Sequence, residues 1–251
     1  MWLTAVIEEG VKIMSVLIGV TSAWSRETKI DEVTTGSYYI ENTYAEAISI
    51  SGGIPLLIPP VFEEAQFEES IQQILNKVDG LLLTGGGGGN RFSRENLPSL
   101  AKQQPTRYQF ERNLIESAWK TRMPLVGICR GFQMLVETFG GSLSSEIIED
   151  HKQQLAETET IHTLQVAKES DFHAIFNVDT WDVNSFHMQK VARVPDTFRV
   201  NMTSPDGVVE GIEAVDHPFC FGFQFHPECL IKKDQTARSF FSHFVEKAKK
   251  R

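Results

Sequence analysis

The sequence predicts a three-layer α/β sandwich in which helices cover both faces of a mostly parallel central sheet. In the first half, short apolar runs alternate with segments of helical periodicity, as in strand–helix units that feed a parallel sheet. From about Ser144 the pattern becomes more strand-like, and an amphipathic helix with Phe240 and Phe244 on one face closes the chain. With 251 residues, 41% of them hydrophobic, the chain has enough apolar material for one sizeable core.

The individual elements follow from the periods of the apolar residues. These periods predict strands over residues 16–20, 54–58, 80–83, 124–128, 164–167, 181–185, 199–202, 208–214 and 219–225, and covering helices over 67–78 and 110–118. Residues 90–106 are polar and predict a long surface loop that borders a site. We expect an N-terminal extension over residues 1–14 and a single domain over 15–251, because the first apolar run follows Met14 directly.

Composition and charge exclude several classes of function. The formal net charge is −9, so the chain is not built to bind nucleic acid or an anionic membrane. No apolar run reaches the length of a membrane span, and the first residues do not form a signal peptide. The odd count of three cysteines argues against a disulfide scaffold and for free thiols in a cytoplasmic protein. The oligomeric state, including a homodimer, stays open.

The clearest local motif is an apolar strand that runs into Cys129, with Gly127 and Gly131 two positions away on either side. This G-x-C-x-G spacing is typical of a nucleophile elbow, a tight strand-to-helix turn in which larger side chains would collide. Cys129 would lie at a helix N-terminus that stabilises a thiolate, and the backbone N–H of Arg130 would face an oxyanion. Taken alone, Cys129 is also compatible with a small apolar residue that ends a buried strand.

A second motif lies in residues 219–228, FCFGFQFHPE. The period of two places the four phenylalanines on one face of a strand and His226 on the other, at the end of the strand. Glu228 follows at i+2, where its carboxylate can orient the imidazole so that His226 accepts a proton from Cys129. A lone histidine at a strand end is more often structural, but the order Cys, His, Glu favours a catalytic triad outside the α/β-hydrolase class.

Four segments together, GICRG, FQFHPE, LLLTGGG and VNSFHMQ, resemble class I glutamine amidotransferase domains, and most closely their peptidase C26 branch. The resemblance runs from about Ser15 to Ala248. It implies the flavodoxin-like fold of that class and a cysteine hydrolase of γ-glutamyl amides. By the same resemblance, Cys129 matches the nucleophile, His226 the base and Glu228 the orienting acid.

The resemblance also implies a set of residues around the substrate. Gly86 or Gly87 matches the second donor of the oxyanion hole besides Arg130, although a glycine run alone also suits a flexible turn. Gln133 matches a residue of the glutamyl pocket. The segment 184–189 lies by the pocket in the family, which implies substrate contacts for three of its residues, Ser185, Phe186 and His187. A structural role in a loop is an equally good interpretation of His187.

The sequence departs from the branch at two places. Gly88 stands where the family usually has aspartate, and the R-D-x-x-E pattern appears here as Arg107, Tyr108 and Glu111, which leaves Arg107 and Glu111 as structural or rim residues. We expect no metal, because no ligand spacing with carboxylates or thiols is found around the remaining histidines, His151, His162, His173, His217 and His243. The implied chemistry needs no cofactor.

We therefore expect hydrolysis of a γ-glutamyl amide of a small amine or amino acid through a thioester, with that small substrate as a partner and a homodimer possible. One alternative is a glutaminase subunit that delivers ammonia to a separate synthetase. Another is a non-catalytic ligand-binding relative, against which the intact Cys129, His226 and Glu228 argue. Hydrolysis of folate polyglutamates is a further alternative, but those enzymes generally carry secretory signals.

Overall fold

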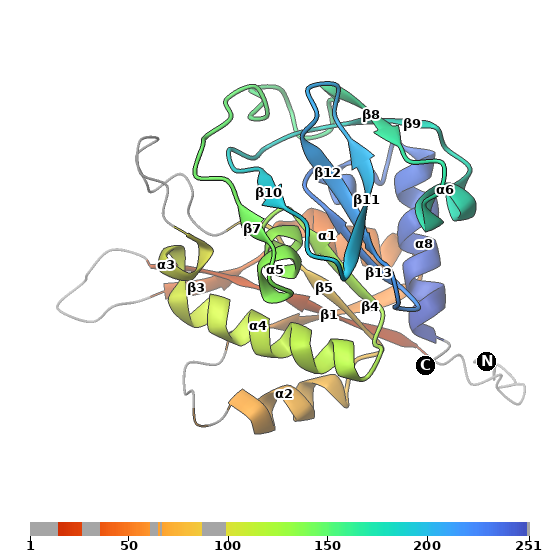
Figure 1. The fold of residues 1–251 in the computed structure, drawn as a ribbon. Helices are drawn as coiled ribbons and strands as arrows, with labels where there is room; N and C mark the ends of the chain where they lie inside the picture. The colour runs from red at the N-terminus through yellow and green to blue at the C-terminus, as the bar shows by residue number, and fades with distance from the viewer. Residues whose placement is uncertain (1–14, 27–35, 61–64, 66, 87–98, 250–251) are drawn as a thin grey trace, which may run out of the picture.

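A computed structural model describes residues 15–26, 36–60, 65, 67–86 and 99–249. Its centre is a nine-stranded sheet (Figure 1). From one edge to the other the strands are β4 Gly53–Ile58, β1 Val16–Thr21, β5 Gly80–Leu83, β6 Leu125–Ile128, β13 Cys220–Phe223, β12 Val209–Ala214, β11 Phe198–Thr203, β8 His162–Val166 and β9 Thr180–Val183. The predicted strands correspond to these nine, with ends shifted by at most two residues.

The sheet has a parallel half and an antiparallel half. Strands β4, β1, β5, β6 and β13 pair in parallel, whereas β12, β11, β8 and β9 continue the sheet in antiparallel pairs. The parallel half comes mainly from the first half of the chain, where strands and helices alternate and crossover connections are available. The α/β fold class is confirmed, in a sheet that is mixed.

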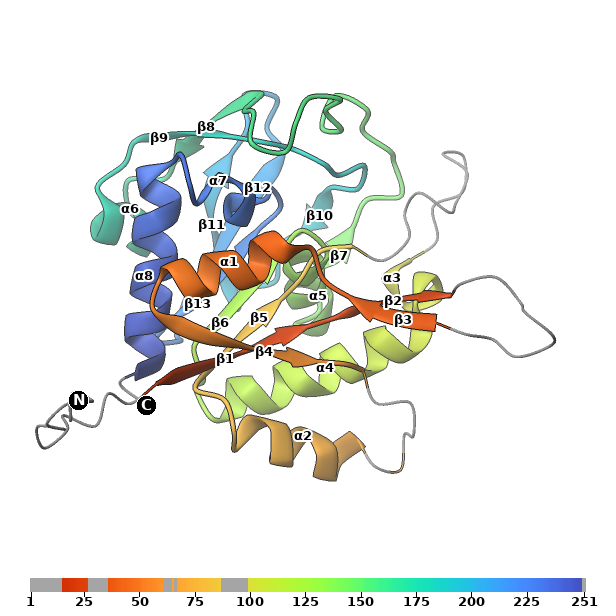
Figure 2. The same cartoon turned by 180° about the vertical axis from the view of Figure 1, so that it is seen from behind.

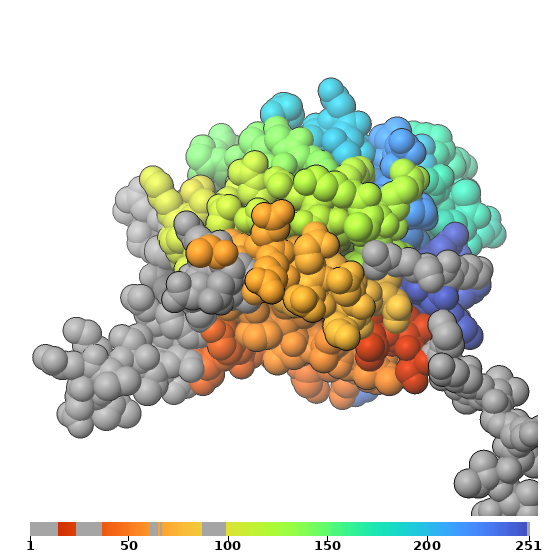
Figure 3. Space-filling model, turned by 90° about the horizontal axis from the view of Figure 1, so that it is seen from below, coloured from red at the N-terminus to blue at the C-terminus, as the bar shows by residue number. Residues whose placement is uncertain are grey.

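Helices cover both faces of the sheet. One face carries α1 Asn42–Ile50, α6 Asp171–Phe176, α7 Pro227–Leu230 and α8 Gln235–Lys249 (Figure 2). The other face carries α2 Phe67–Leu75, α4 Pro105–Lys120 and α5 Arg130–Thr138, and Figure 3 shows α2, in gold, lying against α4. Neighbouring residues of one strand belong to different layers: Leu82 packs in the cluster under α8, whereas Leu81 and Leu83 pack in the cluster under α4 and α5.

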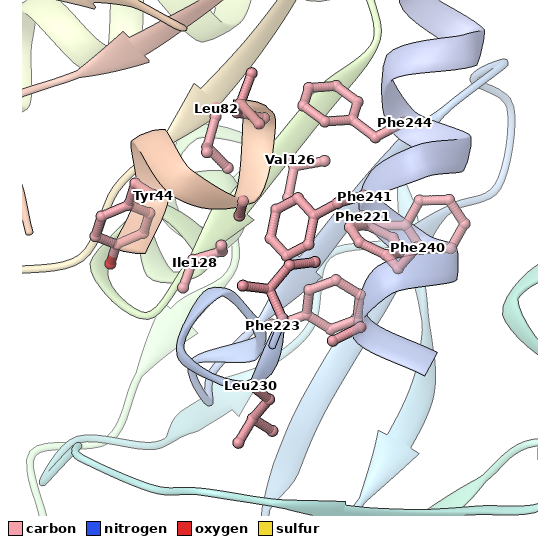
Figure 4. Packing of buried hydrophobic residues seen from close by; sticks show 14 of the residues in the cluster. Tyr44, Leu82, Val126, Ile128, Phe221, Phe223, Leu230, Phe240, Phe241 and Phe244 are labelled. Carbon is pink, nitrogen blue, oxygen red and sulfur yellow. The ribbon is translucent and has the colours of Figure 1, made fainter. Parts of the chain in front are cut away.

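The alternation of residues 219–225 is confirmed. The rings of Phe221 and Phe223 pack against Phe240 of α8 (Figure 4), and Cys220 lies in the cluster on the opposite face. Each of these aromatic rings is at most 3% exposed. Burial of one such side chain stabilises the fold by about 1.5–3 kcal/mol, so this row fixes the strand that leads to His226.

Several elements lie outside the sequence prediction. These are α1, α6, α7 and the strand pairs β2 Ala23–Arg26 with β3 Gly36–Tyr39 and β7 Ser142–Leu143 with β10 Val191–Arg193. The loop predicted over 90–106 is wrong over its described end, where α3 Leu100–Gln103 is followed by α4. The reason is Pro105, whose fixed φ suits the first position of a helix. Residues 87–98 and the predicted extension 1–14 lie outside the described residues. Among the helices of the described residues, none is both long and apolar enough to cross a bilayer.

Candidate active site

The carboxyl ends of adjacent parallel strands meet at one edge of the sheet, which is where open α/β sheets place their sites. Cys129 directly follows β6 and precedes α5. Its φ of +53° and ψ of −103° are rare for any residue other than glycine. The N–H of Cys129 donates to the carbonyl of Phe223 at 2.7 Å, and its own carbonyl accepts from the N–H of Gln133 at 3.1 Å. This is the strained turn of a nucleophile elbow.

The two glycines of the motif are required by close backbone contacts. A Cβ added to Gly127 would lie 2.6 Å from the carbonyl oxygen of Gly131, and a Cβ on Gly131 would collide with the carbonyl of Leu83. Because backbone atoms cannot yield as a flexible side chain does, a larger residue at either position would push α5 away from the sheet. The steric reason inferred from the sequence for G-x-C-x-G is therefore confirmed.

His226 is held from both sides. The side-chain amide of Asn184 accepts from the N–H of His226 at 2.8 Å and donates to its carbonyl at 3.0 Å. The Glu228 carboxylate lies 2.6 Å from His226 Nδ1, so this nitrogen carries a proton and Nε2 is left for the Cys129 side chain, with which His226 shares a hydrogen bond. Burial disfavours the charged ring, but Glu228 and Cys129 outweigh it and raise the pKa of His226 well above its ordinary value.

All three cysteines are free thiols, but they differ in burial. Cys220 and Cys229 are buried, and burial raises the pKa of both thiols, which disfavours their thiolates. Cys129 is partly exposed and lines a cavity together with His226. Of the three, Cys129 is the one that a substrate can reach.

The cavity has a volume of about 510 Å³ and opens over the carboxyl edge of the parallel strands. Most of the predicted substrate residues line it, namely Gly86, Arg130, Gln133, Phe186 and His187. Ser185 does not: it is fully buried, and its hydroxyl donates to the carbonyl of His151 at 2.6 Å, so its role is to hold the wall from behind. Gly87 lies outside the described residues.

The glycine loop after β5 is fixed by Arg107. This buried guanidinium donates to the carbonyls of Thr84, Gly85 and Gly86 at 3.1, 3.2 and 3.1 Å. Glu111 accepts from Arg107 Nε at 2.7 Å and is itself fully buried. These two residues are therefore structural supports of the loop and do not lie at the rim.

Arg130 occupies the first position of α5, directly after Cys129. Its backbone N–H is thus at a helix N-terminus, where the dipole favours a developing negative charge. The side chain of Arg130 has a different contact. It is buried, with Nε 3.6 Å from a Glu111 oxygen, and burial lowers the pKa of Arg130 to about 10.

Tyr44 is a site residue that the sequence did not single out. Its hydroxyl accepts from the N–H of Gly85 at 2.9 Å and lies 3.5 Å from His226 Nδ1. Burial, together with nearby Glu228, raises the pKa of Tyr44 well above its ordinary value, so the phenol stays neutral. Because Tyr44 comes from α1, which has no catalytic motif, only its place in the fold identifies it.

The described residues bring metal-donor atoms together in two groups. Cys229, His226 and Glu228 form one, which overlaps the predicted triad, and His151, His187 and Glu210 form the other. Sequence spacing offers no sign of the second group, because its members are 36 and 23 residues apart along the chain.

Comparisons with known proteins give a family match and several similar proteins. The peptidase C26 family profile matches residues 16–228. The γ-glutamyl-γ-aminobutyrate hydrolase PuuD of Escherichia coli K12 is 31% identical over 222 residues, covering 82% of this chain and 85% of that protein. Protein NtpR of Enterococcus hirae is 27% identical over 218 residues, covering 83% and 89%.

A solved structure shares the fold. A protein of Thermoplasma acidophilum, assigned provisionally to GMP synthase, superposes with a TM-score of 0.63 at 18% identity, covering 94% of this chain and 95% of its own. This match places the chain in the fold of the class I glutamine amidotransferases. The family match over most of the chain, together with the 31% identity to PuuD, establishes that the chain belongs to the peptidase C26 family.

Proposed function

We propose that this protein is a cysteine hydrolase that cleaves the γ-glutamyl amide bond of a small amine or amino acid. The observation that carries the proposal is the array of Cys129, His226 and Glu228. Cys129, on a strained elbow, and His226 line one cavity, and the buried Glu228 lies 2.6 Å from His226 Nδ1. Membership of the peptidase C26 family and the similarity to PuuD support the same reaction class.

The reaction begins when His226 Nε2 takes the proton of the Cys129 thiol. The thiolate sulfur attacks the side-chain carbonyl carbon of the γ-glutamyl group, and the carbonyl π electrons move to oxygen. The backbone N–H groups of Arg130 and Gly86 stabilise this oxyanion. Gly85 is excluded as a donor, because its N–H is already used by Tyr44.

The tetrahedral intermediate then expels the amine. The bond from carbon to nitrogen breaks, the protonated His226 gives its proton to the departing nitrogen, and a γ-glutamyl thioester remains on Cys129. Water, deprotonated by His226, attacks the thioester and releases glutamate and the thiol. Glu228 stabilises the imidazolium that both steps require, which fits its short contact with Nδ1.

The cavity favours a leaving group larger than ammonia. Gln133 and the backbone near the elbow are at hand for the glutamyl half, and the cavity extends past them to Leu100 and Gln103 of α3. At about 510 Å³ it lies in the usual range of small-molecule sites. Delivery of ammonia to a separate synthetase is the competing function, and the two differ in their preferred substrate.

The test is release of glutamate, followed by mass spectrometry, from a panel of γ-glutamyl amides that includes glutamine. We expect a higher kcat/KM for at least one γ-glutamyl amine or amino acid than for glutamine. If glutamine were the best substrate of the panel, the glutaminase function would replace this proposal. No turnover of any γ-glutamyl amide would favour a non-catalytic ligand-binding protein.

A further inference from the structure

Behind one wall of the cavity lies a buried group of two imidazoles and one carboxylate. His151 comes from the turn before β8, His187 from the connection between β9 and β10, and Glu210 from β12. All three are at most 4% exposed, and their donor atoms lie within 4.8 Å of one another. The proposed hydrolysis uses neither His151 nor Glu210.

The ring nitrogens of His187 both face oxygen acceptors. Nδ1 lies 2.9 Å from the backbone carbonyl of Gln189, which can only accept, so Nδ1 carries a proton. Nε2 lies 3.1 Å from Glu210 Oε1. A metal ion bound by Nε2 and Glu210 would take the place of the proton in this contact.

His151 has the same arrangement. Its Nε2 lies 3.0 Å from Asp206 Oδ2 and its Nδ1 lies 2.9 Å from Glu210 Oε1, the oxygen that also faces His187. The second oxygen of Glu210 is fully buried and has no hydrogen bond within the described residues. A buried carboxylate that faces two imidazoles and keeps one oxygen without a partner is the arrangement expected of ligands that share an ion.

We propose that His151 Nδ1, His187 Nε2 and Glu210 bind one divalent transition-metal ion of the zinc type. Imidazole and carboxylate are ligands that zinc takes, and one divalent ion carries the charge of the two protons that it would replace. The proposal is independent of the proposed reaction, because no step of the hydrolysis passes through this ion.

The two contacts of Glu210 fit such an ion after a small adjustment, and the two imidazole nitrogens lie within 4.8 Å of each other. With bonds of about 2.0–2.1 Å, neighbouring ligand atoms of a tetrahedral zinc site lie about 3.3 Å apart. The contacts of Glu210 Oε1 with the two imidazoles, at 2.9 and 3.1 Å, need to widen by only a few tenths of an ångström. With three protein ligands, the fourth position is left for a water molecule.

The outer contacts of both imidazoles match those of metal-binding histidines. Such a histidine usually donates its other ring N–H to a carboxylate or a backbone carbonyl, which fixes the tautomer. His151 has the Asp206 carboxylate in this place, and His187 has the Gln189 carbonyl. Because His187 lines the cavity, the ion would join three distant segments and hold that wall.

The experiment measures metal binding, not activity, in a Cys129→Ala background that removes the reactive thiol. Protein stripped with a chelator is titrated with zinc chloride by calorimetry and with cobalt chloride by visible absorption. We expect one ion per chain and a rise of several degrees in Tm with zinc. We expect Glu210→Gln to weaken binding at least about 100-fold, since it removes a ligand, and Asp206→Asn about tenfold.

Asp206→Asn keeps the experiment decisive if Glu210→Gln does not fold, because the Asp206 side chain is 55% exposed. His173→Gln is the matched control: His173 also pairs with an aspartate, Asp179, but lies outside the group, so binding should not change. Absence of binding would overturn the proposal. So would equal binding by all variants, or a sulfur-to-cobalt charge-transfer band, which would place the ion at Cys229.

Discussion

The two walls of the active-site cavity are built in different ways. The wall at the parallel half comes from short local segments: Cys129 follows β6 directly, and the glycine loop follows β5. The opposite wall comes from the antiparallel half, where Phe186 and His187 are held from behind by Ser185 and by the buried Glu210. The first wall depends on backbone geometry that two glycines permit, and the second depends on polar side chains far apart in sequence.

This difference predicts whether a substitution in each wall should affect catalysis or stability. At the elbow wall, changes to the catalytic side chains should alter the chemical step with little change in stability. At the other wall, changes should act first on stability and on the shape of the cavity. Four substitutions test the elbow wall and its supports, from the largest expected effect to the smallest.

Cys129→Ala should lower kcat by at least about 10³-fold, because it removes the nucleophile. Its Tm should stay close to that of the parent, since the residue is partly exposed and its backbone is held by Phe223 and Gln133. Glutamate release and thermal unfolding measure the two effects. Cys220→Ala is the matched control: it removes a buried sulfur, so it should lower Tm and leave kcat intact. Full activity of Cys129→Ala would contradict the mechanism.

Glu228→Gln should lower kcat by about 10²-fold, and less than His226→Ala does, because the base itself remains. The pH profile should change as well. Glu228 is one of the groups that raise the pKa of His226, so its neutralisation lowers that pKa. Since protonated His226 is needed to release the amine, the alkaline limb of kcat should move to lower pH. If the alkaline limb of kcat did not move, or if kcat fell as much as in His226→Ala, this role of Glu228 would be contradicted.

Gly85→Ala should lower kcat between about 10- and 100-fold by shifting the catalytic groups. The added Cβ would lie 2.8 Å from the Tyr44 hydroxyl, 3.1 Å from His226 Cε1 and 3.3 Å from Cys129 Cβ. Gly207→Ala is the control: its φ is +82° but nothing lies within 4 Å, so it should lower stability by about 1 kcal/mol and keep kcat. Equal kcat values for both variants would show that the elbow wall tolerates added bulk.

Arg107→Lys should lower kcat several-fold and reduce the free energy of unfolding by about 1–3 kcal/mol, because the three N–H donors of an ammonium cannot satisfy three buried carbonyls and the Glu111 carboxylate together. Arg112→Lys is the control, since Arg112 and Glu116 form an exposed i,i+4 ion pair whose loss should have little effect. Chemical denaturation and steady-state kinetics measure both variants. If they behaved alike, the glycine loop would not depend on Arg107.

The same contrast explains what the sequence could predict. The strands, the elbow and the pairing of His226 with Glu228 were accessible because each depends on residues within a few positions of one another. Tyr44, and the support that Arg107 gives to the glycine loop, were not, because α1 and α4 reach the site only through the fold of the sheet. Ser185 shows the converse limit: proximity to the pocket in sequence did not mean contact with it.

The group of His151, His187 and Glu210 could not be predicted from the sequence for a related reason. His151, His187 and Glu210 have no ligand spacing along the chain. A backbone hydrogen bond from His187 to His151 joins the two connecting segments, and both imidazoles reach Glu210 of β12. Long-range pairing in a sheet is specified by many weak contacts and not by one motif. A polar cluster of this kind therefore becomes visible only in the folded chain.

The central claim is that Cys129 forms a thioester with the γ-glutamyl group. The most direct measurement mixes the protein with the best γ-glutamyl amide of the panel, stops the reaction with acid within milliseconds, and maps the modified peptide by mass spectrometry. We expect one added glutamyl residue per chain, on Cys129, and none in Cys129→Ala. A glutamyl adduct on Cys220 or Cys229, or turnover of the substrate with no adduct on any cysteine, would contradict the account.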